Sequence, residues 1–314
     1  MEEALYSHLG FFNTDQVRSD KEGDFLTSPE VSKYFGKIIR NWIHSESNLK
    51  NIIEIGSGTG SLIEQIGIKE ISAVELSSTA REELIKKGID THTTIDELTT
   101  KTSDLIFGNE ILDNIPCSIG LYKDEGWYEK VVLLEENSLA YGLRPIRNEE
   151  LDWINKNNIV PNEDYEFEIQ VNIDKFLNSV IKKINPGKIL LFDYGYEQKN
   201  RDKRMYSSLL RTYKNHHLSV DPIDDPGNID ITYDVNFSSI SSELKYLGYD
   251  VTLKLQRDFL LDNGFNIFFD ELQEKYIAAE GIEKLKINSE LNGMKAIVDS
   301  NGLGGFYCLI AEKL

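Results

Sequence analysis

Three glycines at alternate positions, Gly56, Gly58 and Gly60, constrain the fold of this chain more than any other feature. They follow an apolar segment, residues 51–55, that is typical of a buried strand, and a helix is predicted to begin directly after them at Ser61. Glycine allows the backbone to turn tightly and a ligand to approach it closely. The spacing differs from the Gly-x-Gly-x-x-Gly of dinucleotide sites, and the Lys-Ser/Thr pair of a phosphate-binding loop is absent. Strand, glycine turn and helix in this order indicate an α/β protein.

The rest of the chain alternates between predicted strands and predicted helices. Apolar residues recur at helical spacing from Val31 to Ile43, behind Ser28 and Pro29, which form a favourable helix start. Such alternation favours a mostly parallel sheet with right-handed crossovers. Further strands are predicted over 71–75, 91–94, 104–107, 188–193, 249–255 and 305–312, and further helices over 79–87, 174–184 and 269–280.

Two acidic residues accompany the glycine turn. Glu54 precedes Gly56 by two positions, and Glu75 ends the next predicted strand. A carboxylate at that strand end can accept hydrogen bonds from two ribose hydroxyls, and Glu54 would lie near a cationic aminoacyl group. This is the arrangement of S-adenosyl-L-methionine-dependent methyltransferases, so we expect that cofactor. The alternative is a glycine-rich turn that binds no ligand.

A second cluster of polar residues follows the strand predicted over 104–107. Asn109, Glu110 and Asp113 come directly after it, where the strand end would face the methyl donor, and they are the leading catalytic candidates. Two carboxylates suit a cationic nucleophile such as a guanidinium, which a carboxylate can hold through two hydrogen bonds. The alternative is that Glu110 and Asp113 only cap the following helix.

The charge of the chain limits its partners. It has 53 Asp plus Glu against 34 Lys plus Arg, a formal net charge of -19. Nucleic acid needs a basic footprint and is not expected, whereas a basic protein or peptide is favoured. No stretch approaches the ~20 apolar residues of a membrane span. We recognise neither a signal peptide nor a transit peptide, and we expect a cytoplasmic protein without membrane insertion. The two cysteines are far apart, and His216 has no neighbours at ligand spacing, so no metal is expected.

With these motifs the chain resembles a known family, the MidA-like S-adenosylmethionine-dependent methyltransferases. That family includes the mitochondrial complex I assembly methyltransferase, which modifies protein arginine. The resemblance extends over almost the whole chain and rests on separate motifs in the same order. These are residues 4–6, 10–12, 23–32, 109–116, 126–129, 193–195, 210–213, His216, 226–232 and 235–237.

The resemblance implies a role for several groups of residues. Those of the N-terminal segment would close over the cofactor, the glycines would cradle it, and Glu75 would bind its ribose. Asn109, Glu110 and Asp113 would form the active-site strand end. The N-terminal set is Asp24, Thr27, Ser28 and Glu30, and the residues on the substrate side are Trp127, Glu129, Arg211, His216 and Asp230.

The fold that follows is a Rossmann-like, seven-stranded class I methyltransferase sheet with a helical N-terminal cover and substrate insertions. We expect a single domain over 1–314, with the cover and first helix in 1–50, the cofactor-binding half in 51–116 and a β-rich insertion in 117–185. Residues 186–314 would supply the second half of the sheet, with another insertion at 196–245.

The expected function is N-methylation of protein arginine, and a respiratory-complex subunit is one candidate substrate. Two alternatives remain. The first is a methyltransferase for a small molecule, and the second is an assembly or scaffold protein that binds the cofactor without turnover.

Overall fold

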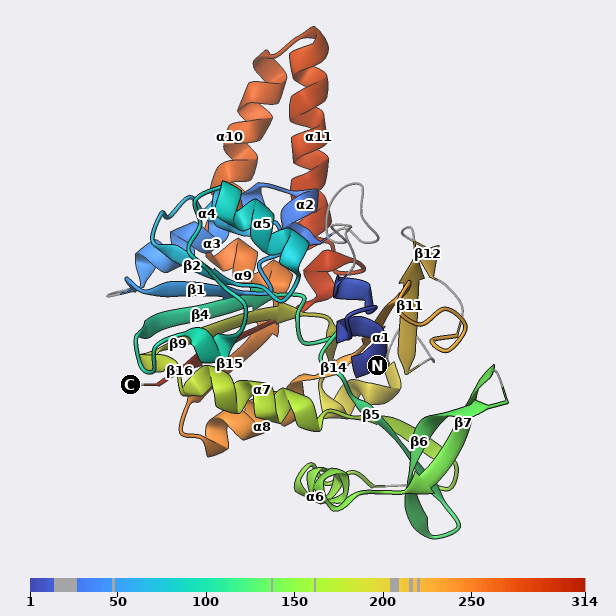
Figure 1. The fold of residues 1–314 in the computed structure, drawn as a ribbon. Coiled ribbons are helices and arrows are strands. Elements are labelled where there is room, and N and C mark those ends of the chain that lie inside the picture. Colours follow the sequence, from blue (N-terminus) through green and yellow to red (C-terminus); the bar gives the residue numbers. More distant parts are fainter. Residues whose placement is uncertain are drawn as a thin grey trace.

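A seven-stranded sheet organises the molecule (Figure 1). The computed structural model describes residues 1–13, 27–46, 49–136, 138–160, 162–203, 209–214, 217–218 and 221–313. The strand order is β3-β2-β1-β4-β9-β16-β15, and all neighbours are parallel except that β16 runs antiparallel to both β9 and β15. This confirms the predicted fold class. The strands are β1 (Ile52–Ile55), β2 (Ile71–Val74), β3 (Thr91–His92), β4 (Ser103–Asn109), β9 (Ile184–Asp193), β15 (Asp250–Leu255) and β16 (Tyr307–Glu312).

Helices cover both faces of this sheet. Because successive side chains of a strand point to opposite faces, Leu105 and Phe107 pack into one core and Ile106 into the other. The first core is closed by α3 (Tyr34–Ser45), α4 (Ser61–Ile66), α9 (Gln256–Asp262), α10 (Phe265–Ala278) and α11 (Gly281–Val298), and the second by α7 (Val171–Ile181) and α8 (Phe237–Tyr246). Further helical segments include α1 (Glu2–Tyr6), η1 (Phe11–Asn13), α5 (Ser78–Lys86), η2 (Ile95–Glu97), η3 (Gln198–Lys203) and η4 (Leu303–Gly305).

The helix predicted from Ser28 is interrupted. It forms α2 (Ser28–Val31) and then α3, because Ser32 between them is extended and its hydroxyl accepts a hydrogen bond from the Tyr34 N–H at 3.3 Å. A serine that bonds the backbone in this way starts a new helix instead of continuing the old one.

Strand β9 begins earlier than the sequence predicts, so Pro186 and Gly187 lie inside it. The pairing of β4 with β9 shifts register between Ser103 and Leu105, and such a bulge tolerates a proline. A Cβ atom on Gly187 would approach the carbonyl oxygen of Asp104 to 2.3 Å, which is why the two strands need glycine there.

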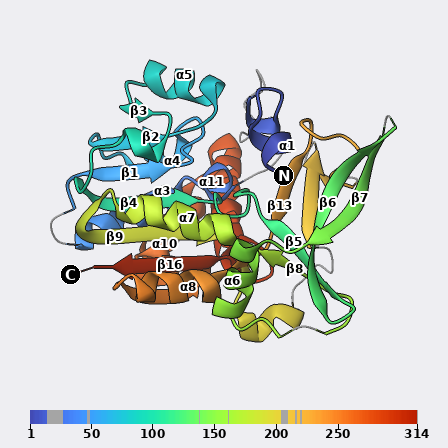
Figure 2. The ribbon, with the colours of Figure 1, turned by 60° about the horizontal axis from the view of Figure 1, so that its bottom comes forward.

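A separate four-stranded antiparallel sheet stands beside the main one (Figures 1 and 2). Residues 126–145 form a hairpin within it, and α6 (Asn148–Lys156) packs on it through Trp153 and Ile154. Its strands, in the order β7-β6-β5-β8, are β5 (Ser118–Lys123), β6 (Gly126–Glu135), β7 (Ser138–Pro145) and β8 (Tyr165–Ile169). Two smaller sheets consist of β11 (Leu210–Lys214), β12 (His217–Leu218) and β13 (Asp230–Tyr233), and of β10 (Gly195–Tyr196) and β14 (Val235–Asn236).

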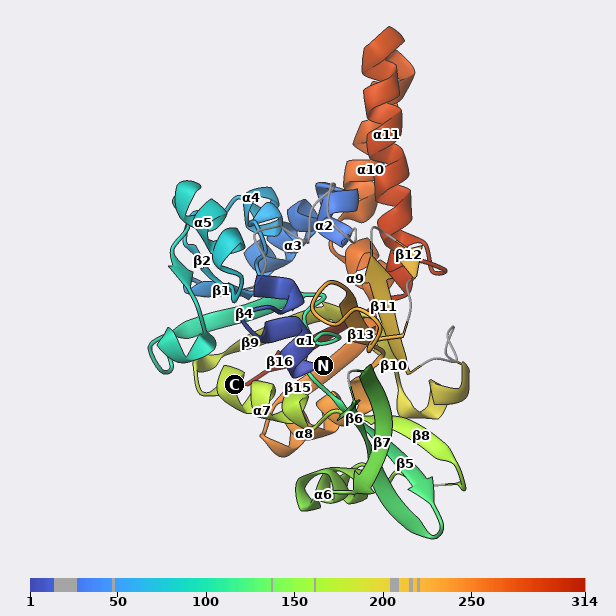
Figure 3. The same cartoon turned by 45° about the vertical axis from the view of Figure 1, so that its right-hand side comes forward.

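Helices α10 and α11 form a hairpin that projects well beyond the sheet (Figures 1 and 3). The sequence predicts only part of α10 and misses α11. Within the described residues, no helix is both long enough and apolar enough to cross a membrane.

Candidate active site

A cavity of about 350 Å³ lies at the carboxyl ends of β1, β2 and β4. Its walls include the glycine turn after β1, the end of β2 and the turn after β4. The N-terminal segments close another side with Tyr6 and Phe12, and with Thr27 and Glu30. In a parallel sheet this edge is where ligands bind, so the cavity lies where the sequence predicts the cofactor site.

The glycine turn has the conformation that its sequence requires. Gly56, Gly58 and Gly60 have φ angles of 67°, 51° and 86°, a region that other residues rarely adopt. A Cβ atom on Gly56 would also meet the Ile111 side chain at 2.3 Å. Gly56 and Gly58 line the cavity, and Gly60 caps the start of α4.

Glu75 lies at the end of β2 with both carboxylate oxygens directed at backbone groups. Oε2 accepts a hydrogen bond from the Gly58 N–H and Oε1 one from the Ser77 N–H, each at 2.8 Å. Burial raises the pKa of Glu75, and these N–H donors oppose that shift. Each oxygen retains a second lone pair, so the carboxylate can still accept hydroxyl donors from a ligand in the cavity.

Two buried oxygens at the cavity have no hydrogen-bond partner within the described part of the chain. They are Oε2 of Glu54, which is 3% exposed, and Oδ1 of Asn109. Burial raises the pKa of Glu54 well above its ordinary value, and the nearby carboxyl groups of Glu75 and Glu30 raise it further. Buried acceptors without partners at a cavity suit a ligand that brings donors or a positive charge.

Glu110 adopts a left-handed backbone conformation, with φ of 53°, directly after β4. Its Oε1 accepts hydrogen bonds from Asn109 Nδ2 at 2.9 Å and from the Ser28 N–H at 3.3 Å. Burial raises the pKa of Glu110 to about 8, and the charges of Asp113 and Glu30 add to the shift. Glu110 lines the cavity and is therefore placed to meet a substrate there.

Asp113 contacts a different partner. The Tyr194 hydroxyl donates a short hydrogen bond to its Oδ2, and the side chain is 3% exposed. Burial raises the pKa of Asp113 to about 6, while the Tyr194 hydroxyl and the charge of Arg211 lower it. The structure therefore places Glu110 at the cavity and Asp113 against Tyr194, so the two carboxylates do not share one set of contacts. The role of Asp113 stays a prediction.

Two of the residues predicted for the substrate side lie in the β11–β13 sheet. Arg211 forms an ion pair with Asp234 at 2.9 Å, and its guanidinium lies over the Tyr194 ring at 4.8 Å from the centroid. Asp230 accepts a hydrogen bond at 2.9 Å from Asn114 Nδ2, and Asn114 itself lines the cavity. This sheet therefore adjoins the site through Asn114 and Tyr194.

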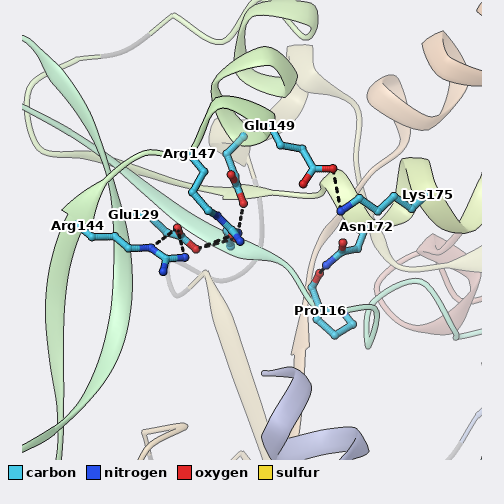
Figure 4. Close-up of polar contacts among 9 residues, drawn as sticks. Pro116, Glu129, Arg144, Arg147, Glu149, Asn172 and Lys175 are labelled. Carbon is cyan, nitrogen blue, oxygen red and sulfur yellow. Dashed lines mark hydrogen bonds and ion pairs between the residues drawn. The ribbon is translucent and has the colours of Figure 1, made fainter.

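The other two described residues of that set, Trp127 and Glu129, lie on β6 of the four-stranded sheet, and Figure 4 shows Glu129 with its partners. Glu129 is paired with Arg144 at 2.7 Å and with Arg147 at 3.4 Å. Trp127 packs against Phe167 with ring centroids 5.0 Å apart. Both side chains therefore have partners in this sheet or directly after it, and their contact with substrate stays a prediction.

Figure 4 also shows how the four-stranded sheet and α6 are attached to α7. Asn172 donates to the carbonyl oxygen of Pro116 at 2.8 Å, and Lys175 forms an ion pair with Glu149 at 2.8 Å. The first of these contacts fixes the chain where it leaves the active-site turn and enters β5.

Two of the predicted site residues, Asp24 and His216, lie outside the described residues. Ser28 is buried, and its hydroxyl exchanges hydrogen bonds with Gln256 in addition to the backbone contact with Glu110. Sequence reasoning did not single out Tyr194 and Asn114 as site residues. Both lie within motifs of the family resemblance, residues 193–195 and 109–116, and those motifs are the signal that could have found them.

The fold and this cavity define a Rossmann-like methyltransferase. The comparisons with known proteins identify its family. Residues 36–252 match the model of the family described as "Putative S-adenosyl-L-methionine-dependent methyltransferase", and the chain belongs to that family. The chain is 26% identical over 308 residues to "Protein arginine methyltransferase NDUFAF7 homolog, mitochondrial" of Caenorhabditis elegans, which covers 83% of this chain and 70% of that protein. It is 25% identical over 323 residues to the NDUFAF7 protein of Danio rerio, covering 85% and 72%.

Solved structures show the same fold. A Burkholderia thailandensis protein crystallised with S-adenosyl-homocysteine has a TM-score of 0.86 and 22% sequence identity, and the match covers 100% of this chain and 86% of that one. A native crystal structure from the same organism gives a TM-score of 0.83 at 23% identity, with 100% and 85% covered.

One expectation from the sequence is wrong. The curated relatives are named mitochondrial proteins, which contradicts the cytoplasmic location inferred above. That inference depended on the composition of the first residues and on the low cysteine count, and neither identifies a compartment by itself.

The protein is thus an S-adenosyl-L-methionine-dependent methyltransferase, and its cavity fits that cofactor. The partnerless oxygens of Glu54 and Asn109 suit the cationic part of the molecule, and Glu75 suits hydroxyl donors. When bound, the cofactor supplies an electrophilic methyl group attached to a sulfonium sulfur.

Proposed function

We propose that this methyltransferase acts on an arginine of a protein substrate and that Glu110 accepts the proton released by the reaction. The relatives named protein arginine methyltransferases support the substrate class. The observation that carries the proposal is the half-buried carboxyl group of Glu110 at the cavity wall, which Asn109 and Ser28 hold and whose pKa is raised to about 8.

The chemistry requires such a group. A guanidinium nitrogen forms the new bond to the methyl carbon as the bond from carbon to sulfur breaks, and one proton must leave the nitrogen. Arginine has a pKa above ~12, so water at neutral pH is a poor acceptor for that proton. A carboxylate in contact with the nitrogen can orient it and take the proton.

The raised pKa of Glu110 gives it two useful states. Without substrate, the carboxyl group is mainly neutral at pH 7, because burial disfavours its charge. A guanidinium that enters the cavity favours the ionised form, so substrate binding and proton release from Glu110 are coupled. The carboxylate then faces the cation before the methyl group is transferred.

The same reasoning supports a basic substrate segment. The net charge of -19 attracts basic proteins or peptides and repels nucleic acid, which therefore has no place in the proposed function. The other predicted site residues stay predictions: Asp24, Thr27, Ser28 and Glu30 on the cofactor side, and Trp127, Glu129, Arg211, His216 and Asp230 on the substrate side.

The test is transfer of an isotope-labelled methyl group into a lysate, followed by mass spectrometry of the labelled protein. We expect label on arginine. The isosteric Glu110→Gln variant should lose at least ~100-fold in turnover, with affinity for S-adenosylhomocysteine changed by less than ~1 kcal/mol. Label recovered only in small molecules would reject the protein substrate. A wild-type rate for Glu110→Gln would reject Glu110 as the proton acceptor.

A further inference from the structure

We infer that Asp193 and Tyr194, the residues at the end of β9, are positioning residues that hold the turn after β4 so that Glu110 faces the cavity. This inference rests on the role proposed for Glu110. Neither residue belongs to the cavity wall as the structure describes it, and both act through the turn of residues 110–113.

Asp193 binds the backbone of that turn. Its side chain is 0% exposed, and its Oδ2 accepts hydrogen bonds from three consecutive N–H groups: Ile111 at 3.1 Å, Leu112 at 2.8 Å and Asp113 at 3.3 Å. The other oxygen accepts the N–H of Tyr194 at 2.9 Å. Buried N–H groups are costly when they have no acceptor, so these bonds favour this one backbone path.

The turn needs such a constraint because Glu110 is strained. Its φ of 53° lies in the left-handed region, which residues other than glycine, asparagine and aspartate rarely adopt. Strain of this kind persists only where the surroundings fix the backbone. Upstream, the Glu110 N–H donates to the Phe192 carbonyl at 2.8 Å, which continues the pairing of β4 with β9. Downstream, Asp193 supplies the fixed point.

Tyr194 holds the side chain at the end of the same turn. Its hydroxyl donates to Asp113, and its ring packs on Phe306 at a centroid distance of 5.3 Å and under the guanidinium of Arg211. Neighbouring residues of one strand end therefore bind the backbone and the side chain of the turn. If both contacts were lost, Glu110 could relax to an ordinary φ and its carboxyl group would leave the cavity wall.

Hydrogen exchange measures the turn without any substrate. Both carboxylate oxygens of Asp193 accept backbone N–H groups. Asp193→Asn keeps the side-chain volume, but it replaces one of these oxygens by an amide N–H₂ group, which is a donor and cannot accept them. We expect the backbone amides of 111–113 to exchange at least ~10-fold faster. Tyr194→Phe keeps the ring contacts and removes only the hydroxyl, so it should give a smaller change in the same direction.

Asp104→Asn is the matched control. Asp104 also accepts backbone N–H groups, from Lys50 at 3.1 Å and Asn51 at 2.9 Å, but at the opposite end of β4. This variant should leave exchange at 111–113 and turnover at wild-type values. A general effect of losing a carboxylate that accepts backbone N–H groups would instead appear in both variants.

The kinetic measurement separates positioning from mere structural support. Asp193→Asn should lower kcat at least ~10-fold while KM and the affinity for S-adenosylhomocysteine stay within ~5-fold, because the turn and not the ribose site is loosened. Unchanged exchange at 111–113 would overturn the inference, and so would faster exchange with wild-type kcat. If no arginine is methylated by the wild-type protein, the proposed function fails, and the exchange result alone still decides whether Asp193 holds the turn.

Discussion

At the scale of single residues, the carboxyl groups around the cavity are unusual in being buried or half-buried and close to one another. Glu54, Glu75 and Glu110 line one cavity, and burial raises the pKa of each of them. Such an arrangement costs stability in the free protein and is relieved by a cation. This cost in stability is therefore concentrated where a sulfonium cofactor and a cationic substrate would bind.

The first prediction concerns stability and pH. Glu110 has a folded pKa of about 8 against an ordinary value of 4.5, so its contribution to stability is complete below pH 4.5 and is lost as pH rises towards 8. Asp113, with a pKa of about 6, acts in the same direction. We expect the free energy of unfolding, measured by denaturant titration, to fall with pH in this window, by up to ~1.4 kcal/mol per pH unit for each such group.

Glu110→Gln should flatten that dependence, because the variant has no proton to lose at this position. Glu274→Gln, at an exposed position of α10, is the matched control and should keep the wild-type slope. Equal slopes for wild type and Glu110→Gln would show that the carboxyl group is not held neutral in the folded protein.

The second prediction concerns Glu75, the residue predicted to bind the ribose. Glu75→Ala should weaken S-adenosylhomocysteine binding by ~1.5–3 kcal/mol in titration calorimetry, the range for a hydrogen bond that involves a charged group. Glu82→Ala, exposed on α5, should bind as the wild type does. Wild-type affinity in Glu75→Ala would remove this residue from the cofactor site.

Residue types and spacing predicted much of the site but not its contacts. Gly56, Gly58 and Glu75 could be placed because a glycine turn and a strand end have fixed geometry in a parallel sheet. The separation of Glu110 from Asp113 could not be predicted, since it depends on Tyr194, a residue 81 positions away along the chain from Asp113. Long-range side-chain contacts of that kind leave no local pattern.

At the scale of elements, the sheet positions the site through the pairing of β4 with β9. β4 and β9 bring the turn of residues 110–113 and the two residues proposed to hold it, Asp193 and Tyr194, to the same edge of the sheet. The pairing of these two strands depends on Gly187, which lies against Asp104. The same elements also explain where prediction from sequence fails. Pro186 and Gly187 predict a turn, yet a bulge admits them into β9, and α11 has no continuous apolar stripe because much of it is exposed.

The third prediction tests this pairing. Gly187→Ala should destabilise the protein by ~1–3 kcal/mol in denaturant unfolding, since the added Cβ has no room beside the Asp104 backbone and the strands must separate. Gly126→Ala, in the open strand β6 with its nearest neighbouring atom at 3.7 Å, is the control and should change stability by less than ~0.5 kcal/mol. Equal effects of both substitutions would contradict the close packing of β4 on β9.

At the scale of the whole molecule, acidic charge governs how partners approach. The formal net charge is -19 over 314 residues. As the fourth prediction, the association rate with a basic peptide, measured by stopped flow, should fall as salt rises, because exposed charges are screened beyond ~8 Å at physiological ionic strength. An acidic peptide of equal length is the control. Rates that do not change with salt would exclude electrostatic steering.

The position of β16 has a consequence for how the protein is made. β16 is formed by residues 307–312, yet it lies between β9 and β15 and provides the pairing partner of β15 within the main sheet. During synthesis on the ribosome, β15 emerges long before the strand that must separate it from β9. Until β16 emerges, β9 and β15 each have an unpaired edge, and an unpaired strand edge can pair with the wrong strand. The sheet can close only when residues 307–312 have left the ribosomal tunnel, so this half of the sheet assembles later than the half that contains β1, β2 and β4, which emerge first.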